Sequence, residues 1–252
     1  MSSRASWLSV LVLAVAALPL LGQGSAGTGF NERAVERKPS PEDRAGIYML
    51  DFFFKDPRVI TVDVPGRGRS FVWYLWYQIG NATGEPRKFY PNFVWICHDT
   101  DTVHHDEILP SALASIRRLE DADNLYDIKN SVSIWNDPIP VSREFNERGE
   151  RIAFPKLVTG VATWANIDRR STQFSIVVFG LSDGFTMVDD PDGKPILRKK
   201  ALKLKFRRLG DELSASSNQI QYQGYEWIYA TSDMRVPVLS DPPPAKKPTE
   251  AP

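Results

Sequence analysis

The chain has 252 residues, and 31 Lys and Arg side chains balance 31 Asp and Glu side chains. This balance argues against a dedicated nucleic-acid binder, which normally carries a clear positive excess. A hydrophobic content of 42% is enough for a folded core. The single cysteine, Cys97, cannot form an internal disulfide, and we expect it to be buried in an apolar strand.

The N-terminus has the pattern of a secretory signal peptide over residues 1–26. Arg4 provides a positive start, residues 7–21 are apolar, and the small residues 24–26 offer a cleavage site. The apolar run is short for a membrane span, although an uncleaved N-terminal anchor is the alternative. We therefore expect an exported protein, periplasmic or extracellular, with no transmembrane segment in the mature chain.

Polar segments are predicted on both sides of one folded domain. Residues 27–45 read as a polar lead-in, which we expect to be disordered. The proline-rich, charged residues 237–252 cannot bury enough apolar surface to order themselves. The folded domain then spans residues 46–236, a length that is compatible with a single domain.

Strand patterns dominate the first half of this domain. Apolar and β-branched runs at 46–54 and 58–64 flank a predicted turn at 55–57. The aromatic segment 70–97 predicts a hairpin whose turn is the polar stretch 81–86. Asn81 also begins a glycosylation sequon, but we interpret its polarity as part of that turn.

The second half contains one expected helix and further strands. Pro110 can start a short helix, in which Leu113, Ile116 and Glu120 have helical spacing. Strands are predicted at 130–135, 160–167, 173–181, 185–188, 196–208 and 218–230. A long loop covers 137–155, and the acidic residues 189–193 have the composition of a turn. About nine or ten short strands separated by turns predict an all-β, antiparallel sandwich with one short helix.

Two stretches resemble a family of uncharacterised secreted bacterial proteins. They are FVWYLWYQIGNATGEPRKFYPNF and GVATWANIDRRSTQFSIVVFGLSDG, which combine an aromatic strand, an N-x-T-G-E-P turn and a later G-V-A-T-W strand before G-L-S-x-G. The resemblance covers most of residues 47–229. It implies an immunoglobulin-like β-sandwich and export, and it implies no activity, catalytic residue or binding residue.

All three histidines lie in the polar segment HDTDTVHHDE, residues 98–107, which we predict to be the loop of a second hairpin. Depending on the strand register, His104 would face either Cys97 or His98. The second register gives a two-histidine clip with Asp101 nearby. Zinc sites need three or four ligands, so this clip would bind zinc or copper only weakly. A solvated hairpin tip is the alternative that we favour.

Two further surfaces could bind a partner. Tyr74 and Trp76 would form a platform for a sugar or a protein if their face of the strand is exposed. Alternatively, a loop or the short helix covers that face. Four basic side chains belong to one strand: Lys199, Lys203, Lys205 and Arg207. They could meet an anionic envelope polymer, or they could protect a strand edge from aggregation.

No serine-hydrolase, zinc-protease or phosphate-loop motif occurs after the leader. We therefore predict a non-enzymatic binding or interaction protein of the cell envelope, without a cofactor beyond weakly held zinc or copper. Its partner would be an envelope protein or a glycan, and not a nucleic acid. The alternatives are a metal-binding protein that uses the histidine hairpin and a carbohydrate-binding module that uses exposed aromatic residues.

Overall fold

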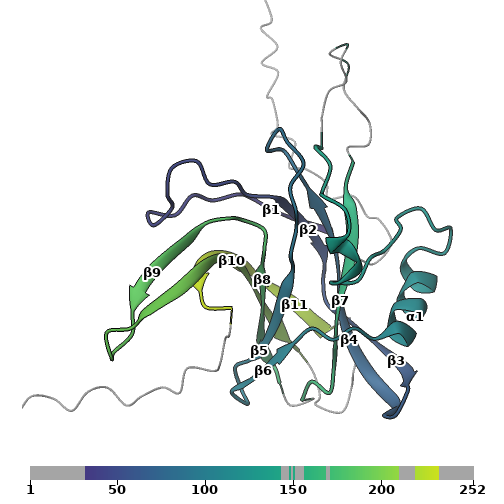
Figure 1. Cartoon of the computed structure of the whole chain (residues 1–252). Helices are drawn as coiled ribbons and strands as arrows, with labels where there is room; N and C mark the ends of the chain where they lie inside the picture. Colours follow the sequence, from purple (N-terminus) through teal and green to yellow (C-terminus); the bar gives the residue numbers. More distant parts are fainter. Residues whose placement is uncertain are drawn as a thin grey trace, which may run out of the picture. The chain divides into compact units, whose positions relative to one another are not determined.

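The strands form two antiparallel sheets whose facing sides share one core (Figure 1). This computed structural model describes residues 32–142, 148, 150, 156–168, 171–209 and 219–232. The two sheets confirm the all-β sandwich that the strand patterns predict. The predicted signal peptide and the tail at 237–252 lie outside the described residues.

The first sheet is built around its longest strand, β4. Its members are β1 (Glu32–Val35), β2 (Asp51–Lys55), β3 (Arg58–Val64), β4 (Gly68–Gly80) and β7 (Val158–Ala165). β2 and β3 pair with one edge of β4, and β7 pairs with the other edge. From Val72 onward its aromatic side chains are buried on both faces, one against the second sheet and the other against residues of helix α1 (Pro110–Glu120).

The segment 55–57 is a bulge and not the predicted turn. Phe54 pairs with Tyr77, and Arg58 pairs with Tyr74. Three residues of this edge therefore stand opposite two residues of β4, which is the pattern of a β-bulge. Pro57 has no N–H to donate to a ladder, and a bulge accommodates that deficit.

The second sheet has the strand order β11-β10-β8-β5-β6, with β9 beside β10. These strands are β5 (Asn92–Cys97), β6 (Thr102–His105), β8 (Gln173–Phe179), β9 (Phe185–Asp189), β10 (Pro195–Arg208) and β11 (Ile220–Ala230). The alternation predicted for β10 is confirmed: Leu202, Leu204 and Phe206 are buried in the core. β8 and β9 follow one another along the same edge of β10, and the β9–β10 hairpin projects beyond the other strands (Figure 1).

The hairpin predicted for 70–97 is wrong because β4 belongs to the first sheet and β5 to the second. The chain between them crosses from one sheet to the other. Asn81 fixes the start of this crossing, since its buried side-chain amide donates to the carbonyl oxygens of Glu85 and Ile139, both at 2.9 Å. The sequon asparagine is therefore an internal hydrogen-bonding residue.

Two local elements differ in how well the sequence predicts them. The helix α1 (Pro110–Glu120) is confirmed, and it packs on the outer face of the first sheet through Ala112 and Ile116. The 3-10 helix η1 (Ser133–Trp135) replaces the strand predicted at 130–135. The Asn130 side chain accepts hydrogen bonds from the backbone N–H groups of residues 132 and 133, and this local turn outcompetes an extended strand.

The described part of the predicted lead-in belongs to the fold. β1 pairs with β2, and the Arg33 guanidinium makes two hydrogen bonds to the Asp56 carboxylate, at 2.7 and 2.8 Å. The folded region therefore begins before residue 46. Backbone pairing and an ion pair hold this segment in place. Because its apolar content is low, the sequence pattern gave no sign that it belongs to the folded domain.

Stacked aromatic rings join the two sheets. Trp95 of the second sheet stacks on Phe174 with 4.2 Å between ring centroids and meets Trp164 of the first sheet edge-on at 5.3 Å. Tyr77 and Phe93 make a similar contact between the sheets at 4.8 Å. The space around these rings is closed by β7, where Gly160 lies against the ring of Tyr77.

We predict that Gly160→Ala destabilises the fold. A Cβ atom at residue 160 would lie 2.5 Å from the hydroxyl oxygen of Tyr77, whose ring is fully buried and cannot move without disturbing its aromatic neighbours. Overpacking of this kind costs about 1–3 kcal/mol. Urea denaturation measures the change, and a free energy of unfolding equal to that of the wild type would contradict the rigid packing of Tyr77.

Candidate functional site: a basic and aromatic cleft beside a free strand edge

The structure separates the residues of the predicted metal clip. The β5–β6 hairpin is confirmed, but both registers that we considered are wrong: Cys97 pairs with Thr102, and His104 pairs with Trp95. His104 therefore lies on the Trp95 side of the sheet. His98 bonds instead to Ser175, which neighbours Ile96 on the opposite side, with 2.8 Å between Nε2 and Oγ. Asp101 is exposed in the loop.

The described residues contain no group of three or more His, Cys, Asp or Glu side chains that could hold a metal ion. The His98–Ser175 pair is a feature that the sequence analysis missed, and its only sequence signal is a serine within an apolar strand. Burial and the nearby Lys203 lower the pKa of His98. Within the described part of the chain, the second ring nitrogen of His98 has no hydrogen-bond partner, so the pair lacks the orienting acid of a catalytic triad.

The proposed aromatic platform is wrong because Tyr74 and Trp76 are each only 2% exposed. Helix α1 covers this face of β4, which confirms the alternative that a loop or the short helix lies over it. The Tyr74 hydroxyl donates to the Glu120 carboxylate at 2.7 Å, and burial together with this carboxylate raises the pKa of Tyr74. Lys55 places its ammonium 4.2 Å from the ring centroid of Trp76. The same ammonium lies 3.4 Å from the Glu120 carboxylate, so Tyr74 and Lys55 both connect the end of the helix to the sheet.

The basic residues of β10 do not act as one surface. Lys203 and Lys205 both pair with Glu226 of β11, at 3.2 and 2.7 Å. β10 is also an interior strand at these positions, so edge protection does not explain them. Lys199 is different: it is exposed, it has no ion pair within the described residues, and it lines a cleft.

This cleft has a volume of about 760 Å³ and opens where the β9–β10 hairpin leaves the sandwich. We define it by those of its rings that are not fully buried and by its cations and carboxylate, which are Tyr48, Tyr90, Phe185, Arg87, Lys88, Lys199 and Asp183. Three positive charges and one negative charge thus line the cleft, and Arg87 also pairs with the carboxylate of Glu85 outside this lining. The volume lies within the range of ordinary ligand sites, which is roughly 300–1,000 Å³.

Cations and rings are already stacked around the cleft. The Arg87 guanidinium lies 4.4 Å from the ring centroid of Tyr48, and the Arg44 guanidinium lies 4.3 Å from that of Phe185. Tyr90 is 57% exposed and leans edge-on against Trp135. The cleft therefore offers apolar ring faces and positive charge together, which suits a partner that carries both apolar groups and carboxylates.

The cleft continues into an open strand edge. β9 pairs only with β10 among the described residues. The N–H of Asp190 donates to the carbonyl of Lys194, and the N–H of Lys200 donates to the carbonyl of Gly184. Even-numbered residues of β9 therefore direct their backbone groups to β10.

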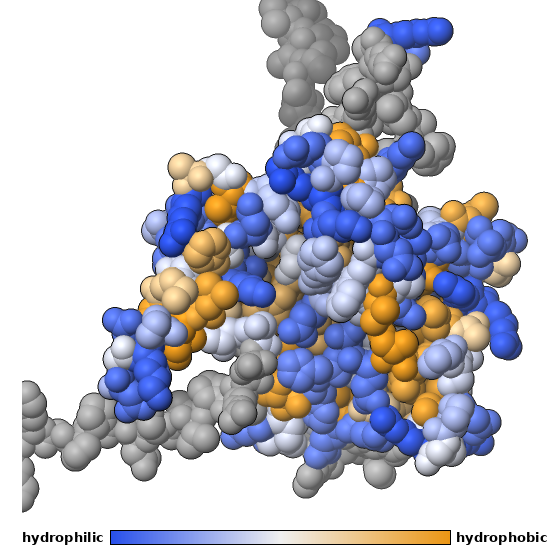
Figure 2. Space-filling view, in the orientation of Figure 1, coloured by the Kyte–Doolittle hydropathy of each residue, from blue (hydrophilic) through white to orange (hydrophobic). Residues whose placement is uncertain are grey.

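It follows that Phe185, Met187 and Asp189 direct their N–H and C=O groups toward the free edge. Pro195 stands opposite Asp189, and its missing N–H fits this pattern because that pair makes no bond across the hairpin. Met187 and Leu197 are 50% and 44% exposed, and Figure 2 shows apolar side chains along the projecting hairpin. The free edge is thus both unpaired and flanked by apolar surface.

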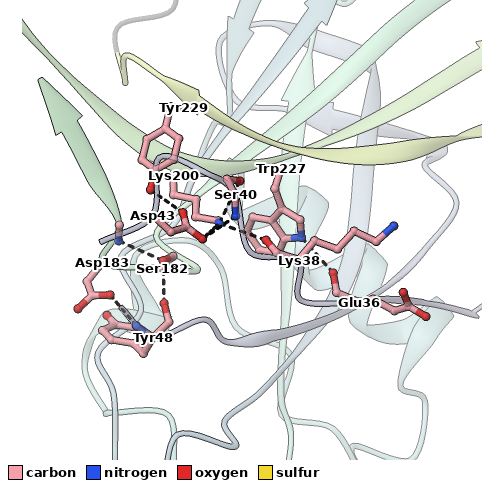
Figure 3. Close-up of polar contacts among 11 residues, drawn as sticks. Glu36, Lys38, Ser40, Asp43, Tyr48, Ser182, Asp183, Lys200, Trp227 and Tyr229 are labelled. Carbon is pink, nitrogen blue, oxygen red and sulfur yellow. Dashed lines mark hydrogen bonds and ion pairs between the residues drawn. The ribbon is translucent and has the colours of Figure 1, made fainter. Parts of the chain in front are cut away.

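A buried ion pair fixes the wall of the cleft (Figure 3). The fully buried Lys200 ammonium pairs with the Asp43 carboxylate and also donates to the carbonyl of Lys38 at 3.1 Å and to the hydroxyl of Ser40 at 3.3 Å. These three acceptors match the three donors of an ammonium group. The Tyr229 hydroxyl donates to the other oxygen of Asp43 at 2.7 Å.

This network holds residues 36–48 against β10 and β11, and Tyr48 stands at the end of that segment. The backbone N–H of Tyr48 donates to Asp183 at 2.8 Å, and the Ser182 hydroxyl donates to the carbonyl of Tyr48 at 2.7 Å. The loop before β9 and the segment that carries Tyr48 are therefore fastened to each other, as Figure 3 shows. Tyr48 is thereby held beside the loop that leads into Phe185.

No protein-family model, no curated protein and no solved structure matches this chain. Among the described residues, no helix is long and apolar enough to cross a membrane. The assignment of a function therefore depends on the geometry of the cleft and its neighbouring edge.

We predict that zinc and copper titrations find no site that depends on His98 and His104 together. The two imidazoles lie on opposite sides of the second sheet, so they cannot share one ion. A His98→Ala/His104→Ala variant should bind these metals as the wild type does in calorimetry. Stoichiometric binding that the double substitution abolishes would contradict this placement.

We predict that Asp43→Asn destabilises the protein at neutral pH by about 3 kcal/mol, because it leaves the buried ammonium of Lys200 without its counter-ion. Glu42→Gln is the matched control on an exposed neighbour. Urea denaturation measures both variants. A loss equal to that of the control would contradict a structural role for the ion pair.

The same pair predicts a pH dependence. Burial alone would raise the pKa of Asp43, but hydrogen bonds from Lys200, the Ser40 N–H and Tyr229 outweigh it and lower the pKa. A carboxyl with a lowered folded-state pKa contributes stability that is complete above the unfolded-state pKa. That contribution is lost as the pH falls through the folded-state pKa. The difference between wild type and Asp43→Asn should therefore shrink in acid.

Proposed function

We propose that this chain is an exported, non-enzymatic interaction protein of the cell envelope whose cleft receives an extended acidic segment of a polypeptide. One observation carries the proposal: a basic, ring-lined cleft continues directly into the edge of β9 that no described strand pairs with. Export is supported by the leader pattern of residues 1–26.

A polypeptide uses more of this site than a glycan would. Either ligand could use the rings and the cations. Only an extended peptide can also bond the outward N–H and C=O groups of Phe185, Met187 and Asp189 by adding a strand to the sheet. Acidic side chains on that strand would meet Arg87, Lys88 and Lys199.

The side chains of the cleft support binding and not turnover. Asp183 is the only carboxylate among the described lining residues, and it already accepts the backbone N–H of Tyr48. The described lining includes serines but no histidine or cysteine, so it offers no nucleophile with an adjacent base.

We predict that the mature protein binds short extended peptides in which Asp or Glu alternates with apolar residues, on an array that also carries their lysine counterparts and acidic glycans. Lys199→Glu and Tyr90→Ala should each weaken binding by about tenfold or more, because one reverses a charge and the other removes a ring from the cleft. Arg118→Glu, on the exposed face of α1, is the matched charge-reversal control and should bind as the wild type does.

Two outcomes would overturn this proposal. Equal binding of acidic and lysine-bearing peptides would show that the positive charge of the cleft does not discriminate between peptides. Binding of acidic glycans alone, lost in the same two variants, would assign the cleft to a carbohydrate and leave the edge of β9 without a role.

A further inference from the structure

We infer that the acidic segment is supplied by a second copy of this chain: two copies pair β9 with β9, and each inserts its acidic hairpin tip into the cleft of the other. The acidic tip is residues 189–193, which join β9 to β10. This inference rests on the proposed function, because it names the occupant of the same cleft and edge.

The length of β9 fixes the register of such a pair. A two-fold axis makes neighbouring copies of one strand antiparallel. If all five residues of β9 are to pair, the axis must pass Met187. Met187 then stands opposite Met187 of the second copy, and Phe185 stands opposite Asp189 of the second copy. Every residue in these pairs is one whose N–H and C=O already point to the free edge.

The antiparallel direction carries the tip to the cleft. Beyond Asp189, the second copy would run past Phe185 toward Gly184, where the cleft lies. The tip contains three carboxylates, Asp189, Asp190 and Asp192, and the cleft contains three cations. Asp190 holds the turn by accepting the N–H groups of Asp192 and Lys194, whereas Asp189 and Asp192 are exposed.

Arg44 adds a specific charge match. Its guanidinium lies over the ring of Phe185, the residue that would face Asp189 of the second copy. By symmetry, the pair of copies would contain this Arg44–Asp189 contact twice. The contact is therefore a sensitive test of the register.

The edge itself lacks the usual protection. Exposed edge strands normally carry an inward charge, a proline or a bulge that prevents pairing. The first four residues of β9, Phe-Thr-Met-Val, carry no charge, and its register with β10 is uninterrupted. A strand of this kind is suited to being covered by another strand.

Cysteine cross-linking tests the register on the mature chain. Met187→Cys should form a disulfide-linked dimer under mild oxidation, because the opposed Cα atoms of a hydrogen-bonded pair lie about 5.5 Å apart. Thr186→Cys is the control, since its two copies would be diagonal neighbours about 7–8 Å apart. The native Cys97 is buried and should not contribute. Equal cross-linking of both variants, or none of Met187→Cys, would overturn the register.

Charge exchange tests the same contact without cysteine. Arg44→Asp and Asp189→Arg should each weaken dimerisation by about tenfold or more in sedimentation equilibrium, and the double variant should recover it. A dimer that neither single variant weakens has its interface elsewhere and overturns the inference.

Peptide binding separates this inference from the proposed function. A monomeric wild type that still binds acidic peptides in a Lys199-dependent way overturns the second copy as occupant and leaves the proposed function standing. A monomeric wild type that binds no acidic peptide overturns both. A dimer with the Met187 register, dissociated by a peptide copying residues 185–193, supports both.

Discussion

The buried pair of Lys200 and Asp43 is the interaction on which the shape of the candidate site depends. Removing an ammonium from water costs several kcal/mol, and a salt bridge returns this cost only when every donor is satisfied. Here the carboxylate of Asp43, the carbonyl of Lys38 and the hydroxyl of Ser40 satisfy all three. The main effect of the ion pair is therefore to fix where residues 36–48 lie, and its net contribution to the free energy of folding is small because the cost of burying the charges offsets it. It places residues 36–48 on the base of the β9–β10 hairpin and so sets where Tyr48 stands.

β10 connects this anchor to the rest of the sandwich. Its even-numbered side chains from Leu202 onward fill the core, and Lys200 continues the same face just where apolar packing ends. The odd-numbered face carries Leu197 and Lys199, which look into the cleft. One strand with a two-residue period thus provides core, anchor and binding surface in succession. At the base of the hairpin this ion pair thus takes the position that an apolar side chain occupies further along the strand.

Much of the fold could be predicted because strand patterns are local. The alternation of Leu202, Leu204 and Phe206 identifies a half-buried strand without knowledge of its partners. The separation of β4 and β5 into different sheets could not be predicted, since both runs have the same aromatic composition and the buried hydrogen bonds of Asn81 that begin the crossing leave no trace in the sequence pattern. Whether Tyr74 and Trp76 are exposed or covered stayed open in the sequence for a similar reason: exposure depends on where α1 packs. The cleft was missed because its walls come from segments more than a hundred residues apart, such as Tyr48 and Asp183.

The position of the β9 edge determines the direction in which a partner strand would lie across the site. β8 and β9 share one edge of β10, yet only β8 is covered, by β5. Among the residues that the structure describes, no strand lies beside β9, and the cleft lies at the point where β5 would have to continue. A partner strand that fills this gap would complete the sheet by hydrogen bonding to the outward backbone groups of β9. The rings and cations of the cleft would then favour an acidic end on that partner strand. An edge alone would pair with many extended chains, and a cleft alone would hold many anions. Their junction at Phe185 restricts the partner to one that is extended and acidic at once.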